Sequence, residues 1–562
     1  MKKIMATKNS YAIGLDYGTN SVRCLIVRCA DGAEIGTHVY GYPHGEQGII
    51  LDPKIPDLAR QHPADYLAGA EASVREAMKK ARQADKDFAP EKVAGIGVDT
   101  TGSTPMSVDA EGRSLTDNPK FANDPNAMAW LWKDHTSTAE AVEITKRASA
   151  KHPEYLKKCG GVYSSEWFWS KIWHCAKVAP EVVKAAATFV EIADWIPAVL
   201  TGTEKNPVRC ICAAGHKAMY HQDWGGYPDG AFLASLNPLV GKVRASLGDV
   251  KAMAINQKVG GLSENWAKRL GLKVGTPVAT GAFDAHLGAV GSGIKPGTLV
   301  KILGTSTCDI MIAPMQPELP YVPGLCGIVP ESVVPCFYGL EAGQSAVGDI
   351  FNWWVQVIKP ANANHADLDA GAGKLAPGES GLLALDWNNG NRTVLVDQRL
   401  TGLVLGQTLQ TRPEEIYRAL IEATAFGARV IIERFEEYGV KVREIVNCGG
   451  IAEKSPVVMQ IYADILGRPM KVSRSGQTCA LGAAIAGAVV GGVYRDVPAA
   501  QKAMTGVKDL VYKPNPKAVK VYNQLFKLYR NLHDAFGLAE ADGNLAHVMK
   551  TLLQIRDAVR RG

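Results

Sequence analysis

Two stretches of the sequence place glycine and hydroxyl side chains in a turn between two apolar, alternating segments. The first is GLDYGTNS at residues 14–21, and the second is LGTSTCD at residues 303–309. Backbone N–H groups and hydroxyls in such a turn can bind phosphate oxygens, while the carboxylate of Asp16 can hold Mg²⁺ through water. The residues concerned are Asp16, Gly18, Thr19, Ser21, Gly304, Thr305 and Ser306. Either turn alone is equally typical of a plain hairpin, so the prediction of a polyphosphate site depends on the repetition of the pattern.

A third candidate is Asp284, in the string GAFDAH at residues 281–286. It falls between a predicted strand end and a segment of small residues. A carboxylate at the edge of a cleft can accept the proton of an attacking hydroxyl, which is what phosphoryl transfer to an alcohol requires. Aspartate is also a favoured helix N-cap, so the prediction of a general base depends on the two flanking turns.

Further segments place charged, hydroxyl or aromatic side chains in apolar surroundings. Such groups, with an aromatic ring as a platform, are what a sugar site needs. The candidates are Thr101, Gly102, Trp132, Lys217 and Glu341. Each of them taken singly is also compatible with a structural role. His216 and His221 do not have the spacing of a helical zinc motif, and we expect no zinc site from them.

Composition and charge exclude several classes of protein. Of the 562 residues, 46% are hydrophobic and 21% charged, which is typical of a globular protein and not of a disordered one. The net charge of +6 is small and its basic residues are scattered, so we expect no nucleic-acid partner. The 11 cysteines form no CxxC pair, which favours a reducing cytoplasm. We expect no signal peptide, because no apolar segment follows the first lysines, and no membrane insertion, because residues 481–494 are too short to span a bilayer.

The elements that must position these residues follow from hydrophobic periodicity. Each turn lies in a predicted β-hairpin, and the two hairpins lie about half a chain length apart, which predicts two similar α/β domains that face each other. Apart from the hairpins, we expect strands at residues 33–40, 93–98 and 444–447, and helices at 65–85, after 413 and at 479–491.

With these motifs in this order, the chain resembles the FGGY carbohydrate kinases, which belong to the superfamily of actin and the heat-shock chaperone ATPases. The string NCGGIAEKSPVVMQ at residues 447–460 resembles the adenosine segment of that family. RLTGLVLGQT, with the helix that follows through ALIEATAFGAR, resembles its C-terminal signature. The resemblance implies an α/β fold of two actin-like (ribonuclease H-like) domains with an ATP-binding cleft between them. It divides the chain into a sugar-binding domain at 1–290 and an adenosine-binding domain at 291–562 with a helical tail.

The resemblance also implies roles for individual residues. The two turns would hold the phosphates, Asp284 would be the general base, and Asp16 and Asp284 would lie near Mg²⁺. Gly449 and Gly450 would let adenine approach the backbone. Ser455 stands where many relatives carry asparagine, so its contact with adenine is left open.

Five strings resemble a narrower branch of the family that acts on a ketopentose. They are GVDTTGSTP, YSSEWFWSKI, AAGHK, GTSTCDI and GLEAGQSA. This resemblance implies ATP·Mg²⁺-dependent phosphorylation of the 5-hydroxyl of L-ribulose, giving L-ribulose 5-phosphate and ADP, in L-arabinose catabolism. Lys217, Glu341, Trp132 and the Thr101–Gly102 turn would bind the sugar, and a homodimer follows by analogy with relatives.

Two alternatives remain open at this point. The first is a kinase of the same family that acts on D-ribulose, xylulose or glycerol. The second is an actin-like, nucleotide-dependent binding protein, because a fold alone does not determine function.

Overall fold

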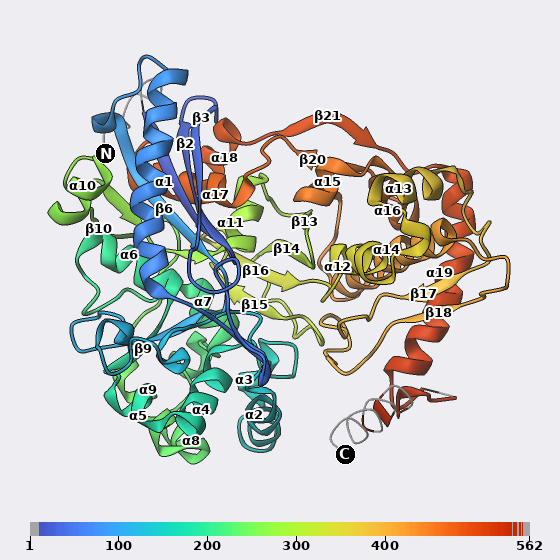
Figure 1. Cartoon of the computed structure of the whole chain (residues 1–562), viewed down its shortest axis with the longest axis horizontal. Helices are drawn as coiled ribbons and strands as arrows, with labels where there is room; N and C mark the ends of the chain where they lie inside the picture. Colours follow the sequence, from blue (N-terminus) through green and yellow to red (C-terminus); the bar gives the residue numbers. More distant parts are fainter. Residues whose placement is uncertain (1–9, 542, 548–549, 552–553, 555–562) are drawn as a thin grey trace.

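The computed structural model describes residues 10–541, 543–547, 550–551 and 554. Its described residues form two lobes, each built on a mixed β-sheet with helices packed against it (Figure 1). The strand order in the first sheet is β10-β11-β6-β1-β2-β3, with β12 beside β6, and in the second it is β15-β16-β14-β13-β19-β20-β21.

The first sheet contains the first predicted hairpin. Its strands are β1 (Tyr11–Tyr17), β2 (Ser21–Arg28), β3 (Glu34–Gly41), β6 (Val93–Thr100), β10 (Lys258–Gly261), β11 (Pro277–Ala279) and β12 (Ala282–Phe283). β1 and β2 are antiparallel, and β6 lies parallel to β1 on the other side. The predicted strands at 33–40 and 93–98 are therefore confirmed as β3 and β6.

The second sheet repeats this arrangement. Its strands are β13 (Thr298–Leu303), β14 (Thr307–Pro314), β15 (Gly327–Pro330), β16 (Phe337–Ala342), β19 (Glu444–Cys448), β20 (Met470–Ser473) and β21 (Val507–Tyr512). β13 and β14 form the second predicted hairpin, β16 continues it antiparallel, and β19 lies parallel to β13. Both sheets thus have a three-stranded antiparallel meander followed by parallel strands, which is the ribonuclease H-like order that the resemblance implied.

Two helices join the lobes, α11 (Asp284–Gly291) and α17 (Thr478–Val490). α17 comes from the second half of the chain, yet it packs against β1 and β6 of the first sheet and against α11. Small residues allow this close approach: a Cβ atom on Gly97 of β6 would lie 1.8 Å from the backbone oxygen of Ala483 in α17. Both helices share one hydrophobic core with residues of the two sheets.

The other helices cover the outer faces of the sheets and build the lower part of the first lobe (Figure 1). Those before α11 are α1 (Pro63–Ala84), α2 (Thr138–Lys151), α3 (Pro153–Lys157), α4 (Phe168–Val178), α5 (Pro180–Ala185), α6 (Ile192–Thr201), α7 (Ile211–Lys217), α8 (Gly230–Leu236), α9 (Pro238–Leu247) and α10 (Glu264–Leu270). Those after it, besides α17, are α12 (Gly348–Asn352), α13 (His365–Lys374), α14 (Pro413–Glu437), α15 (Gly450–Lys454), α16 (Pro456–Leu466), α18 (Val497–Met504) and α19 (Pro516–Gly537). α1, α14 and α17 confirm the predicted helices; α19 begins the predicted helical tail, whose last residues, 555–562, lie outside the described part.

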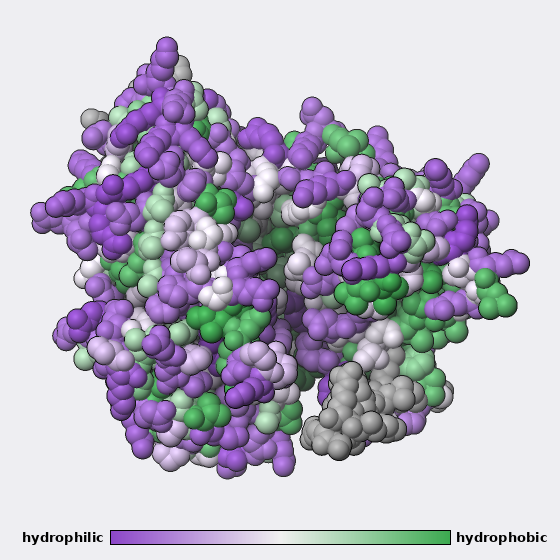
Figure 2. Space-filling view, viewed as in Figure 1, coloured by the Kyte–Doolittle hydropathy of each residue, from purple (hydrophilic) through white to green (hydrophobic). Residues whose placement is uncertain are grey.

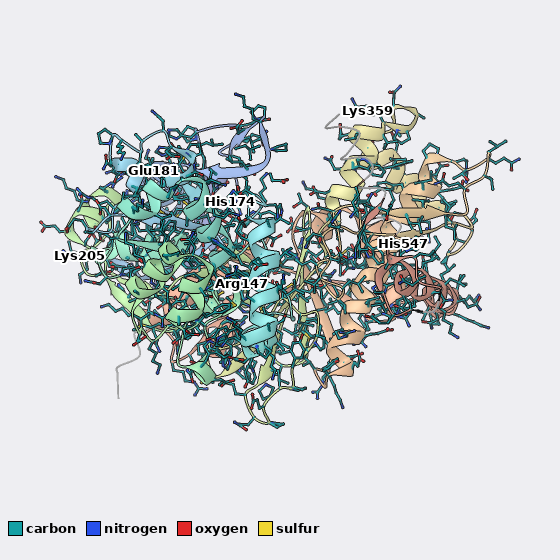
Figure 3. The ribbon with its side chains drawn as sticks, turned by 90° about the horizontal axis from the view of Figure 1, so that it is seen from below. Arg147, His174, Glu181, Lys205, Lys359 and His547 are labelled. Atoms are coloured by element: carbon teal, nitrogen blue, oxygen red, sulfur yellow. The ribbon has the colours of Figure 1, made fainter. Side chains whose placement is uncertain are left out.

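Three small sheets complete the fold. They comprise β4 (Ile50–Asp52), β5 (Ile55–Gln61) and β8 (Ala129–Trp130); β7 (Pro105–Val108) and β9 (Thr188–Glu191); and β17 (Leu383–Leu385) and β18 (Leu403–Leu405). The space-filling view shows the surface hollowed between the two lobes (Figure 2). Figure 3 shows the lobes from below, with Arg147, His174, Glu181 and Lys205 labelled in the first and Lys359 and His547 in the second. None of the helices in the described part of the chain has the length and apolar character needed to cross a membrane.

Candidate active site

A cavity of about 240 Å³ lies between the lobes, at the two hairpin turns. The predicted residues that line it are Thr19, Thr101, Gly102, Trp132, Lys217, Asp284, Gly304, Thr305, Ser306 and Glu341. The residues that line it without having been predicted are Glu166, Phe283, Ala285, His286, Ile302, Cys308, Arg392 and Cys479. The fold therefore brings the predicted base, all the predicted sugar residues and four of the predicted phosphate residues to one cavity.

Three carboxylates meet at one edge of the first sheet. Asp16 and Asp99 lie opposite each other on the parallel strands β1 and β6, and Asp284 follows β12, which is also parallel to β6. Asp16 accepts a hydrogen bond from Arg23 at 3.1 Å. The sequence placed Asp99 at the start of a polar segment at a strand end but gave it no specific role, and it did not identify Arg23.

The electrostatics of these carboxylates suit a divalent cation. Burial raises the pKa of Asp99 well above its usual range, and the neighbouring carboxylates of Asp16 and then Asp284 raise it further. Burial also raises the pKa of Asp16, against the effect of Arg23. Both oxygens of Asp99 are enclosed without a hydrogen bond among the described residues. Adjacent buried carboxylates repel each other unless a proton or a cation lies between them, and carboxylate oxygens are the ligands that Mg²⁺ prefers.

Asp284 has the properties of a general base near neutral pH. Burial, and then the charge of Asp16, raise its pKa to about 7. It is the first residue of α11 and not its N-cap, which is Phe283. Its carboxylate accepts only a short hydrogen bond from the N–H of Ala285, at 2.6 Å, among the described residues. The proton-accepting oxygens are therefore available to a hydroxyl that enters the cavity.

Lys217 at the end of α7 and Glu341 at the end of β16 form an ion pair across the two lobes. The ammonium of Lys217 donates to both oxygens of Glu341, at 2.8 and 3.0 Å. Burial opposes the ionisation of Glu341, but the adjacent ammonium of Lys217 holds its pKa well below the usual range. Lys217 also lies 5.3 Å from the ring centroid of Trp167. The pair therefore stays charged in a nearly dry pocket, where each group can hydrogen-bond to a hydroxyl-rich ligand.

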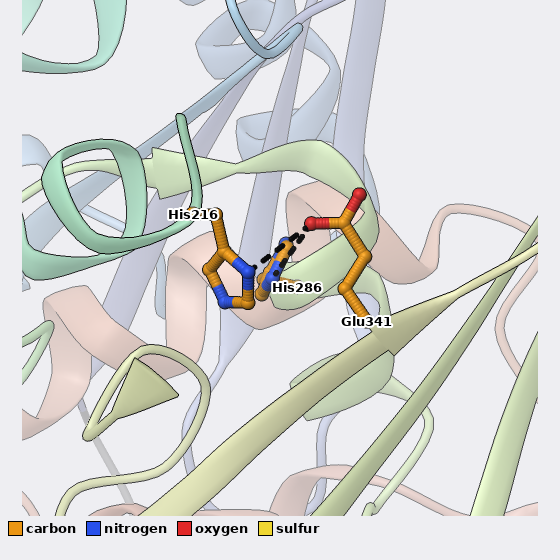
Figure 4. A group of neighbouring side chains, drawn as sticks. All are labelled: His216, His286 and Glu341. Carbon is orange, nitrogen blue, oxygen red and sulfur yellow. Dashed lines mark ion pairs between the residues drawn. The ribbon is translucent and has the colours of Figure 1, made fainter. Parts of the chain in front are cut away.

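Two histidines lie beside Glu341 (Figure 4). Nδ1 of His216 is 3.3 Å and Nε2 of His286 is 3.8 Å from the same carboxylate oxygen. Burial lowers the pKa of His286 to about 4 and that of His216 well below its usual value, so both rings are neutral. The three side chains are a possible metal-ligand set by distance. A metal ion there would have to displace the ammonium of Lys217, so the group is better suited to line a sugar pocket.

The turn at Thr101 and Gly102 is fixed from behind by buried charges. Glu191 accepts hydrogen bonds from the hydroxyl of Ser103 and, at 2.7 Å, from the N–H of Thr104. Lys171 donates to the carbonyl of Ser103 at 2.8 Å. These contacts hold the backbone of the turn against the cavity and leave it little freedom to move.

The side chain of Trp132 connects the predicted sugar platform with the first phosphate turn. Its indole N–H donates to the hydroxyl of Thr19 at 3.1 Å. In the second turn, the N–H of Gly304 donates to the carbonyl of Ser306 at 3.0 Å, and Thr305 accepts from Val347 at 2.8 Å. Both turns are thus closed by their own backbone hydrogen bonds.

The remaining predicted residues lie outside the cavity lining. Gly18 and Ser21 close the first turn with a 2.9 Å hydrogen bond from N–H to carbonyl. Gly449 adopts a φ of 93°, and a Cβ atom there would lie 2.5 Å from the carbonyl oxygen of Leu303, so it lies against the end of β13. Gly450, the first residue of α15, has open space around its Cα. The hydroxyl of Ser455 caps α16, where it accepts from the N–H of Val458 at 3.2 Å. The adenosine contacts of Gly449, Gly450 and Ser455 stay predictions.

Comparisons with known proteins agree with this geometry. Residues 11–291 match the N-terminal domain and residues 299–490 the C-terminal domain of the FGGY family of carbohydrate kinases. A protein named Ribulokinase from Shouchella clausii is 42% identical, covering 98% of this chain and 99% of its own. Another with that name, from Vibrio parahaemolyticus, is 41% identical and covers 94% and 96%.

The solved structures show the same fold. A ligand-bound xylulose kinase from Lactobacillus acidophilus superimposes with a TM-score of 0.77 at 20% identity, covering 94% of this chain and 99% of the other. A Plasmodium falciparum glycerol kinase with ADP gives 0.74 at 15% identity, covering 95% and 99%. With both family domains present in order and near-full-length relatives at about two-fifths identity, this chain belongs to the FGGY family of carbohydrate kinases.

Proposed function

We propose that this protein transfers the γ-phosphoryl group of ATP to the 5-hydroxyl of L-ribulose, giving L-ribulose 5-phosphate and ADP, as a step of L-arabinose catabolism. The observation that carries the proposal is the single cavity that joins Asp284, the Lys217–Glu341 pair and the second phosphate turn. The substrate is supported by near-full-length relatives named Ribulokinase.

The lining residues divide the cavity into a sugar part and a phosphate part. Lys217 and Glu341 offer donors and acceptors to the sugar hydroxyls, and the Thr101–Gly102 turn offers backbone groups. Thr19, Thr305 and Ser306 lie where the phosphates of ATP would be held. Asp284 connects the two parts of the reaction, because its carboxylate takes up the proton that the sugar hydroxyl loses when it attacks the phosphate.

The reaction requires one bond to form as another breaks. The 5-hydroxyl oxygen bonds to the γ-phosphorus, the bond from that phosphorus to the bridging oxygen breaks, and ADP leaves with its electron pair. Asp284 orients the hydroxyl and receives its proton. If the transition state is loose, that proton moves late, and Asp284 acts mainly by orienting the nucleophile.

Mg²⁺ is part of the proposal, and Asp16 and Asp99 are the residues that would hold it. When bound with ATP, it would neutralise charge on the phosphate oxygens. Support comes from the enclosed, unbonded oxygens of Asp99 beside Asp16, because this donor set matches the preference of a hard cation. Asp284, which the sequence also suggested as a ligand, helps to raise the pKa of Asp99, and the charge of Asp16 helps to raise the pKa of Asp284.

A cytoplasmic location and a homodimer complete the proposal. All eleven cysteines are free, and only Cys336 among them is exposed, which supports a reducing compartment. The homodimer rests on analogy with relatives, and light scattering of the purified protein tests it.

The decisive assay measures ADP formation from ATP·Mg²⁺ with L-ribulose, D-ribulose, L-xylulose, D-xylulose and glycerol, each supplied separately. We expect the highest kcat/KM with L-ribulose. A higher value with another sugar would contradict the substrate but keep the mechanism. ADP formation that no sugar stimulates would instead favour a nucleotide-dependent binding protein.

A further inference from the structure

Arg392 lies in the segment between β17 and β18, and its side chain lines the cavity opposite the first lobe. The guanidinium is anchored to the second phosphate turn through one nitrogen. Nη2 donates to the carbonyl of Thr307 at 2.5 Å and, weakly, to that of Gln344 at 3.4 Å. This places the cation next to the turn that contains Thr305 and Ser306.

The charge of Arg392 has no counter-ion among the described residues. Both of its hydrogen bonds use Nη2, so Nη1 has no acceptor in the described chain, and Nε is enclosed without one. Elsewhere in the described chain, buried or half-buried arginines such as Arg60 and Arg418 are paired with carboxylates. A half-buried guanidinium that has no carboxylate partner and lines a cavity can pair with an anion that enters it, so the site suits an anionic ligand.

The neighbouring acidic groups do not supply that anion. Both oxygens of Glu341 already accept from Lys217. Burial raises the pKa of Cys308 to about 12 and also raises that of Cys326, so both thiols are neutral. Glu166 lines the same cavity and its charge helps to raise the pKa of Arg392, but the two side chains form no direct ion pair in the described chain.

We propose that Arg392 binds the oxygens of the phosphoryl group as it passes from ATP to the sugar, and then the phosphate of the product. The inference deepens the proposed function and rests on it. Guanidinium N–H groups donate strongly to phosphate oxygens, and the donor of Arg392 that remains open for this is Nη1, whose two N–H groups have no acceptor among the described residues. Charge on those oxygens is spread further in the transition state, where a fixed cation in a water-poor cavity acts most strongly.

The test compares Arg392→Gln with the wild type by steady-state kinetics and by calorimetric binding of two ligands. We expect kcat to fall at least about 10²-fold, as for other fixed donors to a transition state. Affinity for L-ribulose 5-phosphate should fall at least tenfold, whereas affinity for unphosphorylated L-ribulose should change less than twofold. Unchanged sugar binding also shows that the variant is folded.

Two further variants complete the design. Arg399→Gln removes an exposed arginine from the same segment, and we expect it to leave kcat and both affinities unchanged. Arg392→Lys keeps the charge but loses the paired donors, so it should recover part of kcat and of the product affinity. Should Arg392→Gln not fold, the lysine variant carries the test, with at least a threefold loss of product affinity expected and no change in sugar affinity.

Equal losses of affinity for the sugar and its phosphate would overturn the inference, since they would assign Arg392 to the sugar or to the fold. A normal product affinity in a folded Arg392→Gln protein would also overturn it. A wrong substrate assignment can be told apart from a wrong role for Arg392. If the wild type prefers another sugar, the proposed function fails, but the same comparison with that sugar and its phosphate still tests Arg392.

Discussion

Asp284 depends on its surroundings for its chemistry. In water an aspartate is too weak a base to accept a proton from a hydroxyl near neutral pH, but burial and the charge of Asp16 raise its pKa to about 7. The same two effects raise the pKa of Asp99. In the proposed mechanism these carboxylates have separate roles: Asp284 would accept a proton, and Asp16 and Asp99 would attract a cation.

We predict that Asp284→Asn lowers kcat at least about 10²-fold and changes the KM for sugar much less, because the amide keeps the shape but cannot accept the proton. In the wild type, kcat/KM should fall about tenfold per pH unit below about pH 7, because the active form is the ionised carboxylate. Steady-state rates from pH 5.5 to 8.5 measure both effects.

Two results would contradict this role. The first is an Asp284→Asn protein with nearly normal turnover. The second is a wild-type profile that stays flat to pH 5.5, since a base with a raised pKa must lose activity as it is protonated. The residual kcat/KM of Asp284→Asn should not fall below about pH 7, because the variant has no carboxylate at this position to be protonated.

The sequence identified the side chains that lie in recognisable turns and strings, and it missed those whose role arises from a partner far along the chain. Thr19, Asp284 and Ser306 were found because each is next to a strand end. Arg392 follows a short strand with no periodic pattern, and only folding brings it to Thr307. What distinguishes Arg392 in the structure is that it has no carboxylate partner among the described residues, and a sequence does not show which charged residues are paired.

At the scale of elements, strands and helices were predictable where the apolar pattern is local. Both hairpins, β6, α1 and α14 have clear periods of two or of about 3.6 residues, and they were confirmed. The position of α17 was not predictable in the same way. Its sequence is apolar on all sides, which indicates burial but not which sheet it contacts, and it crosses to the first lobe.

The packing of α17 on β6 makes a prediction about stability. Gly97→Ala would place a methyl group 1.8 Å from the carbonyl oxygen of Ala483, so helix and strand must separate. We expect the free energy of unfolding to fall by about 2–3 kcal/mol, as for other overpacked cores. Gly41→Ala is the matched control, because it also lies in a strand and its Cβ would meet nothing within 4 Å.

Thermal unfolding at one scan rate compares the two variants. The control should stay within about 0.5 kcal/mol of the wild type, as exposed substitutions usually do. Equal midpoints for Gly97→Ala and Gly41→Ala would mean that α17 and the first sheet are not in close contact in solution.

At the scale of the whole molecule, the site is divided between the two lobes. Asp284, Lys217 and Thr101 come from the family domain at residues 11–291, whereas Glu341, Thr305 and Arg392 come from the one at 299–490. The lobes already touch at the sugar end, through the Lys217–Glu341 pair and the contact of His216 with Ser332 at 2.9 Å. The surface is hollowed between the lobes (Figure 2), and residues of both turns line the cavity.

This division predicts that sugar and nucleotide bind cooperatively. In the proposed binding mode each ligand would touch both lobes, so the first to bind would hold the lobes in the arrangement that the second needs, and the second would then lose less freedom on binding. We expect L-ribulose to raise the affinity for a non-hydrolysable ATP analogue with Mg²⁺ by about fivefold or more, and the analogue to raise the affinity for L-ribulose by the same factor. Titration calorimetry in both orders measures the two factors, and thermodynamic linkage requires them to be equal.

Affinities that do not depend on the other ligand would mean that the lobes are already fixed in their final arrangement. In that case the exclusion of water during transfer would have to come from the substrates themselves and not from closure of the lobes.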